Sequence, residues 1–230
     1  MPDKSQNFFS PSTHGFVRVA CVTPKVHLAD PQANLAEHVD LAKRADDVGA
    51  DLVVFPELSL TAYSLDDLFM QEVLLDVAKQ ALADLIAASK GVRPVLIVGV
   101  PLRFGGAVYN CAAVIQDGAC LGLTPKTFLP NYREFYEKRW FASGAGIENA
   151  AIRVGDMECP FGTELIFAAT DFEAFTFAVE ICEDMWSPQT PSTRLALNGA
   201  HIIVNLSASP VTVGKSRTRK RICAATSERL

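Results

Sequence analysis

Short runs of apolar residues, repeated along the chain and separated by helix-like segments, limit the fold of this sequence more than any other feature. Continuous apolar runs of this length indicate strands that are buried on both faces of a sheet. Strands that alternate with helices predict an α/β protein in which the helices cover the sheets. We expect strands at Phe16–Val22, Asp51–Phe55, Pro94–Val100, Leu165–Ala169, Phe175–Ile181 and His201–Leu206.

Helix signals lie between these strands. Asp30 and Pro31 are residue types favoured at an N-cap and in a first turn, and this helix should end at Gly49. Ser64–Asp67 has the spacing of a capping box and should open a second helix that runs to about Ala88. That helix is predicted to bury a face made of Leu68, Leu74, Leu75, Ala78, Leu82 and Leu85. Further helices are expected near Ser192–Leu197 and from about Ser216.

A predicted hairpin makes the sheets mixed. Ala107–Ile115 and Ala119–Leu123 flank the turn residues Gln116-Asp-Gly118. Gly49–Glu57 and Gly199–Ser207 share an order of Gly-Ala, apolar strand and polar terminus, which suggests two similar halves. Helices and hairpins together favour two packed sheets with helices outside, an α-β-β-α sandwich, over a doubly wound single sheet.

The bulk composition argues for a globular protein of small-molecule chemistry. A net charge of −5 makes a nucleic-acid partner improbable, and six scattered cysteines without a CxxC pair suggest neither a zinc site nor a disulfide framework. Residues 1–15 form a polar leader without the apolar core of a signal peptide, and no apolar run approaches the ~18 residues of a membrane span. We therefore expect a cytoplasmic protein with no membrane partner.

The stretch FTFAVEICEDMW places Cys182 among three carboxylates, those of Glu180, Glu183 and Asp184. Negative neighbours disfavour a thiolate, so this setting needs an explanation. Strand alternation predicts that Glu180 and Cys182 share a side, and Cys182 ends a strand, where active sites of α/β proteins gather. From these residues alone a nucleophile and a core-filling cysteine are about equally supported.

A nucleophilic cysteine needs a base or a nearby cation, because an unperturbed thiol is mostly protonated at neutral pH. The four histidines are poorly placed for that role, which argues against a Cys–His pair. Glu57 ends one strand just after a proline, and Lys126 follows Pro125 just after the hairpin. Taken singly, each also fits a surface acid or a solvated lysine.

Two motifs resemble other kinds of site. Ser209–Ser216 ends in the GKS of a phosphate-binding loop, but it begins with Ser and contains Pro210, which has no N–H to offer a phosphate. The basic run Lys215–Arg221 lacks interleaved aromatic residues, so a solvated helical face explains it better than a nucleic-acid patch.

Considered together, three segments carry a resemblance to a known family. FPELSLTAYS, PKTFLPNYREFYEKRWFASG and VEICEDMW occur in the order and spacing of the nitrilase, or carbon–nitrogen hydrolase, superfamily, over residues 16–230. More narrowly, HGFVRVA, YREFYEKR, EICEDMW and NLSASPVTVGK are similar to the N-terminal glutaminase domains of glutamine-dependent NAD⁺ synthetases. The resemblance implies an α-β-β-α sandwich of the nitrilase type.

The resemblance also implies roles for particular residues. Glu57 would be the general base, Lys126 the support of the oxyanion and Cys182 the nucleophile, with Glu137 as the second glutamate that positions the lysine. Tyr132, Glu183 and Ser209 would bind the α-amino and carboxylate ends of glutamine, and the GKS loop would form a wall of the substrate site. A substrate ammonium would explain the carboxylate beside the nucleophile.

The implied reaction is hydrolysis of the glutamine amide to glutamate and ammonia through a cysteine thioester, with no metal or organic cofactor. The ammonia would supply NAD⁺ synthesis from deamido-NAD⁺ in a C-terminal synthetase domain that uses ATP and Mg²⁺. No SGGxDS-type pyrophosphatase loop occurs here, and the chain ends within a predicted helix. We therefore expect a sandwich truncated at its C-terminus, weakly active alone, that forms a homo-oligomer. The alternatives are a stand-alone amidase or nitrilase and a catalytically silent scaffold.

Overall fold

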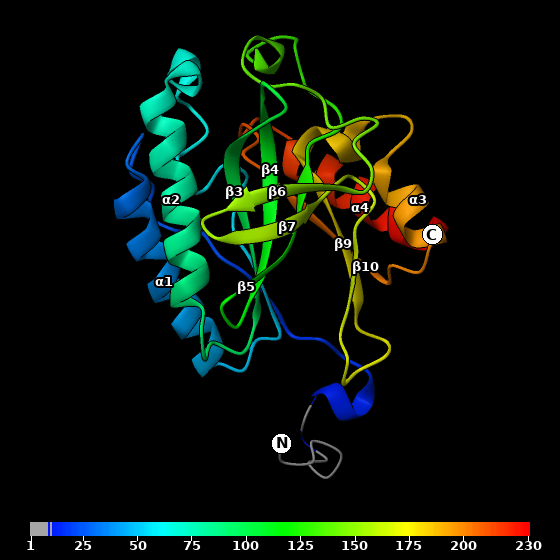
Figure 1. Cartoon of the computed structure of the whole chain (residues 1–230). Helices are drawn as coiled ribbons and strands as arrows, with labels where there is room; N and C mark the ends of the chain where they lie inside the picture. The colour runs from blue at the N-terminus through cyan, green and yellow to red at the C-terminus, as the bar shows by residue number, and fades with distance from the viewer. Residues whose placement is uncertain (1–8, 10) are drawn as a thin grey trace.

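Two β-sheets packed face to face organise the molecule, and helices cover their outer faces (Figure 1). The computed structural model describes residue 9 and residues 11–230. Most of the predicted polar leader lies outside these residues, and the part that is described contains a short 3₁₀ helix, η2 (Pro11–His14). The predicted α-β-β-α architecture is confirmed.

The larger sheet has seven strands in the order β1-β2-β3-β4-β5-β7-β6. The first three strands pair in parallel, and the β3–β4 and β4–β5 pairs are antiparallel. The predicted hairpin is therefore β4–β5, and its turn uses Asp117 and Gly118, both with positive φ. The strands are β1 (Val19–Cys21), β2 (Leu52–Val54), β3 (Val95–Phe104), β4 (Ala107–Gln116), β5 (Ala119–Pro125), β6 (Ala150–Val154) and β7 (Met157–Phe161).

The smaller sheet has three strands in the order β10-β9-β8, which are β8 (Ile166–Ala168), β9 (Thr176–Ile181) and β10 (Ile202–Leu206). β9 pairs with β10 in parallel, so both strands end at the same edge. Val179 and Ile181 pack from this sheet against Ile97 and Val114 of the larger sheet. This shared apolar layer fixes how the two sheets face each other.

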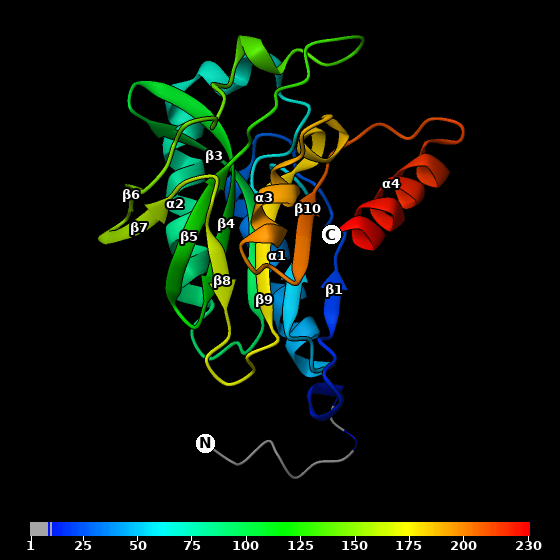
Figure 2. The same ribbon diagram turned by 90° about the vertical axis from the view of Figure 1, so that its right-hand side faces the viewer.

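Helices α1 (Pro31–Asp47) and α2 (Glu72–Ala88) cover the outer face of the larger sheet, and α3 (Pro191–Leu197) covers the smaller one (Figure 2). Helix α1 begins as predicted, since the Asp30 side chain accepts a hydrogen bond from the Ala33 N–H. Helix α4 (Lys215–Arg229), all of which is described, has no buried residue and stands at the side of the sandwich. Among the described residues, no helix is long and apolar enough to cross a membrane.

The predicted capping box at Ser64–Asp67 is wrong. Asp66–Met70 forms a separate 3₁₀ turn, η3, and α2 starts only at Glu72, with Gln71 as its N-cap. Leu68 belongs to η3 and is exposed, whereas the other predicted apolar positions of this helix are buried. The β6–β7 hairpin was not predicted, because its strands are short and polar residues interrupt them.

A glycine in β3 lets the chain after β2 turn sharply. A Cβ atom at Gly99 would lie 2.2 Å from the Leu58 nitrogen and 2.6 Å from the Pro56 oxygen. Leu58 itself has a positive φ of 52°, a strained conformation for leucine. The turn at residues 56–58 therefore packs directly on the β3 backbone, and only glycine fits beneath it.

We predict that Gly99→Ala lowers the free energy of unfolding by several kcal/mol, because backbone atoms rather than a flexible side chain must move. Urea unfolding measures this change. Val98→Ala is the control: it removes buried methyl groups from the helix-facing core and should cost only about 2 kcal/mol. Equal losses for the two variants would contradict the close contact at Gly99.

Candidate active site

Glu57 is the first polar side chain of the site, and it lies in the sharp turn after β2. Its carboxylate is almost fully buried, at 2% exposure. Oε1 accepts a hydrogen bond from Asn110 Nδ2 at 2.8 Å, and Oε2 accepts one from the Ala208 backbone N–H at 2.9 Å. Asn110 belongs to the larger sheet and Ala208 follows β10 of the smaller one, so Glu57 links the ends of both sheets.

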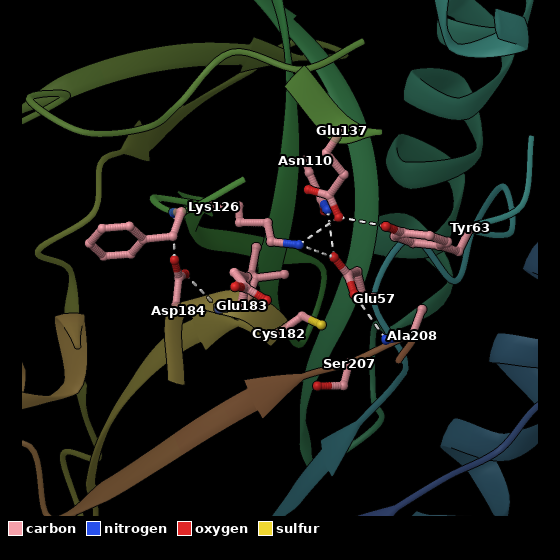
Figure 3. Close-up of polar contacts among 12 residues, drawn as sticks. Glu57, Tyr63, Asn110, Lys126, Glu137, Cys182, Glu183, Asp184, Ser207 and Ala208 are labelled. Atoms are coloured by element: carbon pink, nitrogen blue, oxygen red, sulfur yellow. Dashed lines mark hydrogen bonds and ion pairs between the residues drawn. The ribbon is translucent and has the colours of Figure 1, made fainter. Parts of the chain in front are cut away.

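Lys126 directly follows β5 and is the most deeply buried charged residue of the site, with no exposed surface. Its Nζ lies 2.7 Å from Glu57 Oε1 and 2.8 Å from Glu137 Oε1 (Figure 3). Glu137 comes from the short 3₁₀ helix η4 (Glu137–Arg139) within the irregular segment after the hairpin. Tyr63 donates its hydroxyl proton to the same Glu137 oxygen at 2.7 Å. The four residues thus form one network, in which Tyr63 is partly buried and the other three are buried.

Opposing effects set the charges in this network. Burial acts to lower the pKa of Lys126, but attraction to Glu57 and Glu137 outweighs it and raises that pKa above its ordinary value. Burial raises the pKa of Glu137 to about 7, although the Lys126 ammonium opposes the rise. Lys126 is therefore held as a cation between two carboxyl groups.

Cys182 follows β9 and opens the 3₁₀ helix η5 (Cys182–Trp186). Its φ is +46°, in the left-handed region that a cysteine rarely adopts. This turn breaks the strand alternation, so the prediction that Glu180 and Cys182 share a side is wrong. Cys182 packs in the layer between the sheets together with Val179 and Ile181. Glu180 instead accepts a hydrogen bond from the Ser192 N–H at the start of α3.

The Cys182 side chain points toward Glu57 and the Lys126 ammonium (Figure 3). Burial raises the pKa of its thiol to about 12, and the Glu57 carboxylate adds to the rise while Lys126 opposes it. The resting thiol therefore keeps its proton. Glu57, the Lys126 ammonium and the thiol, which are distant in sequence, meet in one small buried region.

Asp184 connects the backbone just after Lys126 to the turn that carries Cys182. One of its oxygens accepts hydrogen bonds from the Thr127 and Phe128 N–H groups at 3.2 and 2.8 Å, and the other accepts from the Ile181 N–H at 2.9 Å. The residue is 1% exposed, and burial raises its pKa to about 7. Asp184 thus sets the distance between Lys126 and Cys182 without touching either side chain.

The three residues predicted to bind substrate are less buried than the network: Tyr132 is exposed, and Glu183 and Ser209 are partly buried. The Tyr132 hydroxyl donates to both carboxylate oxygens of Glu183, at 2.8 and 3.0 Å. Ser209 is partly buried in the loop after β10, next to Ala208. At the start of α4, Lys215 Nζ lies 5.8 Å from the ring centres of both Phe135 and Trp186. Of the GKS segment, Lys215 is partly buried over these rings, whereas Gly214 and Ser216 are exposed, so its role as a wall of the substrate site stays a prediction.

Histidine takes no part in the network just described. His38, the buried histidine, stacks on Phe55 and bonds the Asn34 carbonyl and Ser59 Oγ within the helix-facing core. Burial lowers its pKa to about 4, so it is neutral. Residues that sequence reasoning missed are Tyr63, Asn110, Asp184, Ser207 and Ala208. All but Asn110 gave a signal, by lying within the FPELSLTAYS, VEICEDMW and NLSASPVTVGK segments.

A buried thiol, a carboxylate and an ammonium on a two-sheet sandwich define a class of enzymes that attack carbon–nitrogen bonds. Residues 18–226 match the model of the carbon–nitrogen hydrolase family, and this chain belongs to that family. The crystal structure of a carbon–nitrogen hydrolase from Helicobacter pylori G27 shares its fold, with a TM-score of 0.64 and 18% identity over 92% of this chain and 68% of that one.

Within the family, the chain is similar to one kind of enzyme in particular. It is 48% identical to the glutamine-dependent NAD(+) synthetase of Mycobacterium tuberculosis H37Rv, over 97% of this chain and 33% of the relative. The Thermotoga maritima enzyme of that name is 34% identical over 89% of this chain and 32% of its own length. The synthetase structure from Cytophaga hutchinsonii aligns with a TM-score of 0.79 and 25% identity, over 91% of this chain and 33% of that one. The chain spans about a third of the length of these relatives.

We predict that Asp184→Asn lowers the free energy of unfolding by about 2 kcal/mol, because an amide cannot accept all three buried N–H groups. Urea unfolding at neutral pH measures the loss. Asp40→Asn is the matched control: that carboxylate is 65% exposed, with Arg44 at 3.7 Å, and its loss should cost less than about 0.5 kcal/mol. If Asp184→Asn were as mild as the control, the connecting role of Asp184 would be refuted.

Proposed function

We propose that this chain hydrolyses the side-chain amide of glutamine to glutamate and ammonia. The observation that carries the proposal is the fully buried Lys126 ammonium, held between Glu57 and Glu137 beside the Cys182 thiol. The similarity to glutamine-dependent NAD(+) synthetases supports glutamine as the substrate. In a longer protein, the ammonia would serve NAD⁺ synthesis from deamido-NAD⁺.

Proton transfer to Glu57 would start the reaction. The thiol, with a pKa raised to about 12, is protonated at rest and must lose its proton as it attacks. Glu57 is the base next to it. As the Cys182 sulfur bonds to the amide carbon, the proton passes to the Glu57 carboxylate, and negative charge develops on the amide oxygen.

Lys126 and the backbone N–H of Glu183 would hold that oxyanion. When the tetrahedral intermediate collapses, the carbon–nitrogen bond breaks and Glu57 returns its proton to the leaving nitrogen, which departs as ammonia. A water molecule then gives a proton to Glu57 and attacks the γ-glutamyl thioester. Glutamate leaves, and the sulfur recovers its proton from Glu57.

Glu137 would act through Lys126 rather than on the substrate. It shares Lys126 Nζ with Glu57, and the Tyr63 hydroxyl fixes the oxygen that it offers. An ammonium held by two carboxyl groups keeps its charge in a buried site and cannot turn away. Its position is thereby set before the oxyanion forms.

Glu183 and Tyr132 would select the free amino acid. A substrate with an α-ammonium group favours a carboxylate next to the nucleophile, and Tyr132 already holds the Glu183 carboxylate in place. We assign the α-carboxylate to the neighbourhood of Ser209. The rival function, a stand-alone amidase or nitrilase that acts on another small amide, has no need of this pair.

The mechanism needs only water and groups of this chain, which are side chains and one backbone N–H, so we retain the prediction of no metal or organic cofactor for this step. ATP and Mg²⁺ would act in a synthetase domain joined to its C-terminal side, and we keep a homo-oligomer as the expected assembly. The four-residue network of the site and the family membership argue against a silent scaffold.

We predict that Cys182→Ala lowers ammonia release from L-glutamine by about 10⁴-fold or more, because no covalent intermediate can form. An ammonia assay on the purified protein measures the rate. Cys223→Ser is the control, since Cys223 is exposed on α4, and it should retain the wild-type rate. Undiminished hydrolysis by Cys182→Ala would rule out the nucleophile.

We predict that the wild-type protein prefers glutamine over glutaramate, which lacks the α-amino group, by roughly 100-fold in kcat/KM. Glu183→Gln should remove most of that preference by weakening glutamine hydrolysis alone, because it loses the charge that pairs with the ammonium. Glu134→Gln, at an exposed position of the neighbouring loop, should keep it. Equal use of both substrates by the wild-type protein would favour the stand-alone amidase.

A further inference from the structure

A polar chain that the proposed mechanism does not use lies behind Cys182. Asn205 lies on β10, and its side-chain amide approaches the backbone of Cys182. Its Nδ2 donates hydrogen bonds to Glu180 Oε1 at 3.3 Å and to the Cys182 carbonyl at 3.5 Å. Both partners are acceptors, so the orientation of the Asn205 amide is fixed with Oδ1 on the other side. There Oδ1 accepts the hydroxyl proton of Ser207 at 2.8 Å.

Glu180 holds the far end of this chain. It is 3% exposed, and its second oxygen accepts the Ser192 N–H at 3.1 Å. A buried carboxylate with two donors cannot turn toward the thiol, and it offers Asn205 an acceptor in only one direction. Glu180 therefore serves the orientation of Asn205.

Ser207 lies beside Cys182 at the end of this chain (Figure 3), and an interaction of its hydroxyl with the sulfur acts to lower the pKa of the thiol. A serine hydroxyl has a single proton to donate, and here it has two candidate acceptors, Asn205 Oδ1 and the sulfur. While Cys182 is a thiol, the Asn205 oxygen is the stronger acceptor. A thiolate is a charged acceptor and competes better for the same proton.

We propose that Ser207 is a further residue of the reaction, one that turns its hydroxyl proton from Asn205 to the Cys182 sulfur as the thiol loses its own proton to Glu57. It would stabilise the thiolate on attack and again when the thioester breaks. No bond is made or broken by Ser207 itself. This role rests on the proposed glutamine hydrolysis, but its effect on the thiol does not require a substrate.

The charged and titratable groups that face Cys182 come from several elements, and a measurement on the thiol must keep them unchanged. They are Glu57 after β2, Tyr63 in the following turn, Lys126 after β5 and Tyr132 in the irregular segment. Glu137 and Glu183 adjoin this set through Lys126 and Tyr132. Ser207→Ala replaces none of these groups. Its effect on the thiol can therefore be assigned to the lost hydroxyl.

The test is the rate of alkylation of Cys182 by iodoacetamide between pH 7 and 9, followed on the Cys182 peptide by mass spectrometry. We expect Ser207→Ala to react about tenfold more slowly at every pH, because a tenfold smaller thiolate fraction corresponds to a pKa one unit higher. The kcat for glutamine should fall by a similar factor with KM little changed. Ser89→Ala, which loses a buried, hydrogen-bonded hydroxyl on the helix side of the large sheet, should match the wild type.

Asn205→Ala gives a second test with the opposite sign. Without its resting acceptor, the Ser207 hydroxyl should turn to the sulfur more often and speed alkylation. In the Ser207→Ala background the same change should have no effect, since Asn205 acts through Ser207. Any other pattern would contradict the assigned role of Asn205.

The outcomes separate this inference from the proposed function. If the wild-type protein hydrolyses glutamine but Ser207→Ala keeps the wild-type alkylation rate, the role of Ser207 is overturned while the glutaminase stands. If glutamine is not hydrolysed but Ser207→Ala still slows alkylation, the effect of Ser207 on the thiol stands and the substrate assignment fails. Circular dichroism and urea unfolding confirm that each variant is folded.

Discussion

The buried ion network of Glu57, Lys126 and Glu137 is the interaction on which the site depends. An ammonium without solvent contact is tolerated only when carboxylates surround it, because burial of an unpaired charge costs far more than one ion pair returns. The three residues come from a turn, a strand end and an irregular segment. The fold must bring these segments together, or the lysine cannot remain charged inside the protein.

Strained turns at strand ends make that convergence possible. Leu58, next to Glu57, and Cys182 both adopt positive φ, which sends the chain out of the regular alternation of a strand. Packing and hydrogen bonds offset this cost. Gly99 has no side chain, so the first turn can pack against β3, and Asp184 accepts hydrogen bonds from three N–H groups near the second turn. The reactive side chains therefore sit on backbone that regular structure holds rigid.

The sequence alone predicted every strand except those of the β6–β7 hairpin, and the two-layer arrangement, since continuous apolar runs carry a strong signal. It also placed Glu57, Lys126 and Cys182 at strand ends, which is why the fold could bring them together. The prediction failed where the chain did not follow local sequence rules for helix caps and strand alternation. Ser64–Asp67 has the composition of a capping box, yet the chain there forms η3, and alternation gave the wrong side for Cys182 because no residue pattern announces its positive φ.

The contacts of Asn110 and Ala208 with Glu57 could not be foreseen, because the tertiary fold alone brings β4 and the loop after β10 to this carboxylate. The Ala208 contact has a particular consequence. Its donor is a main-chain amide, so exchanges of the side chain at that position leave the hydrogen bond to the Glu57 carboxylate intact, whereas proline removes the donor. An alanine scan would not test this position, because the residue there is already alanine. Which substitutions it tolerates depends on the backbone N–H and not on the identity of the side chain.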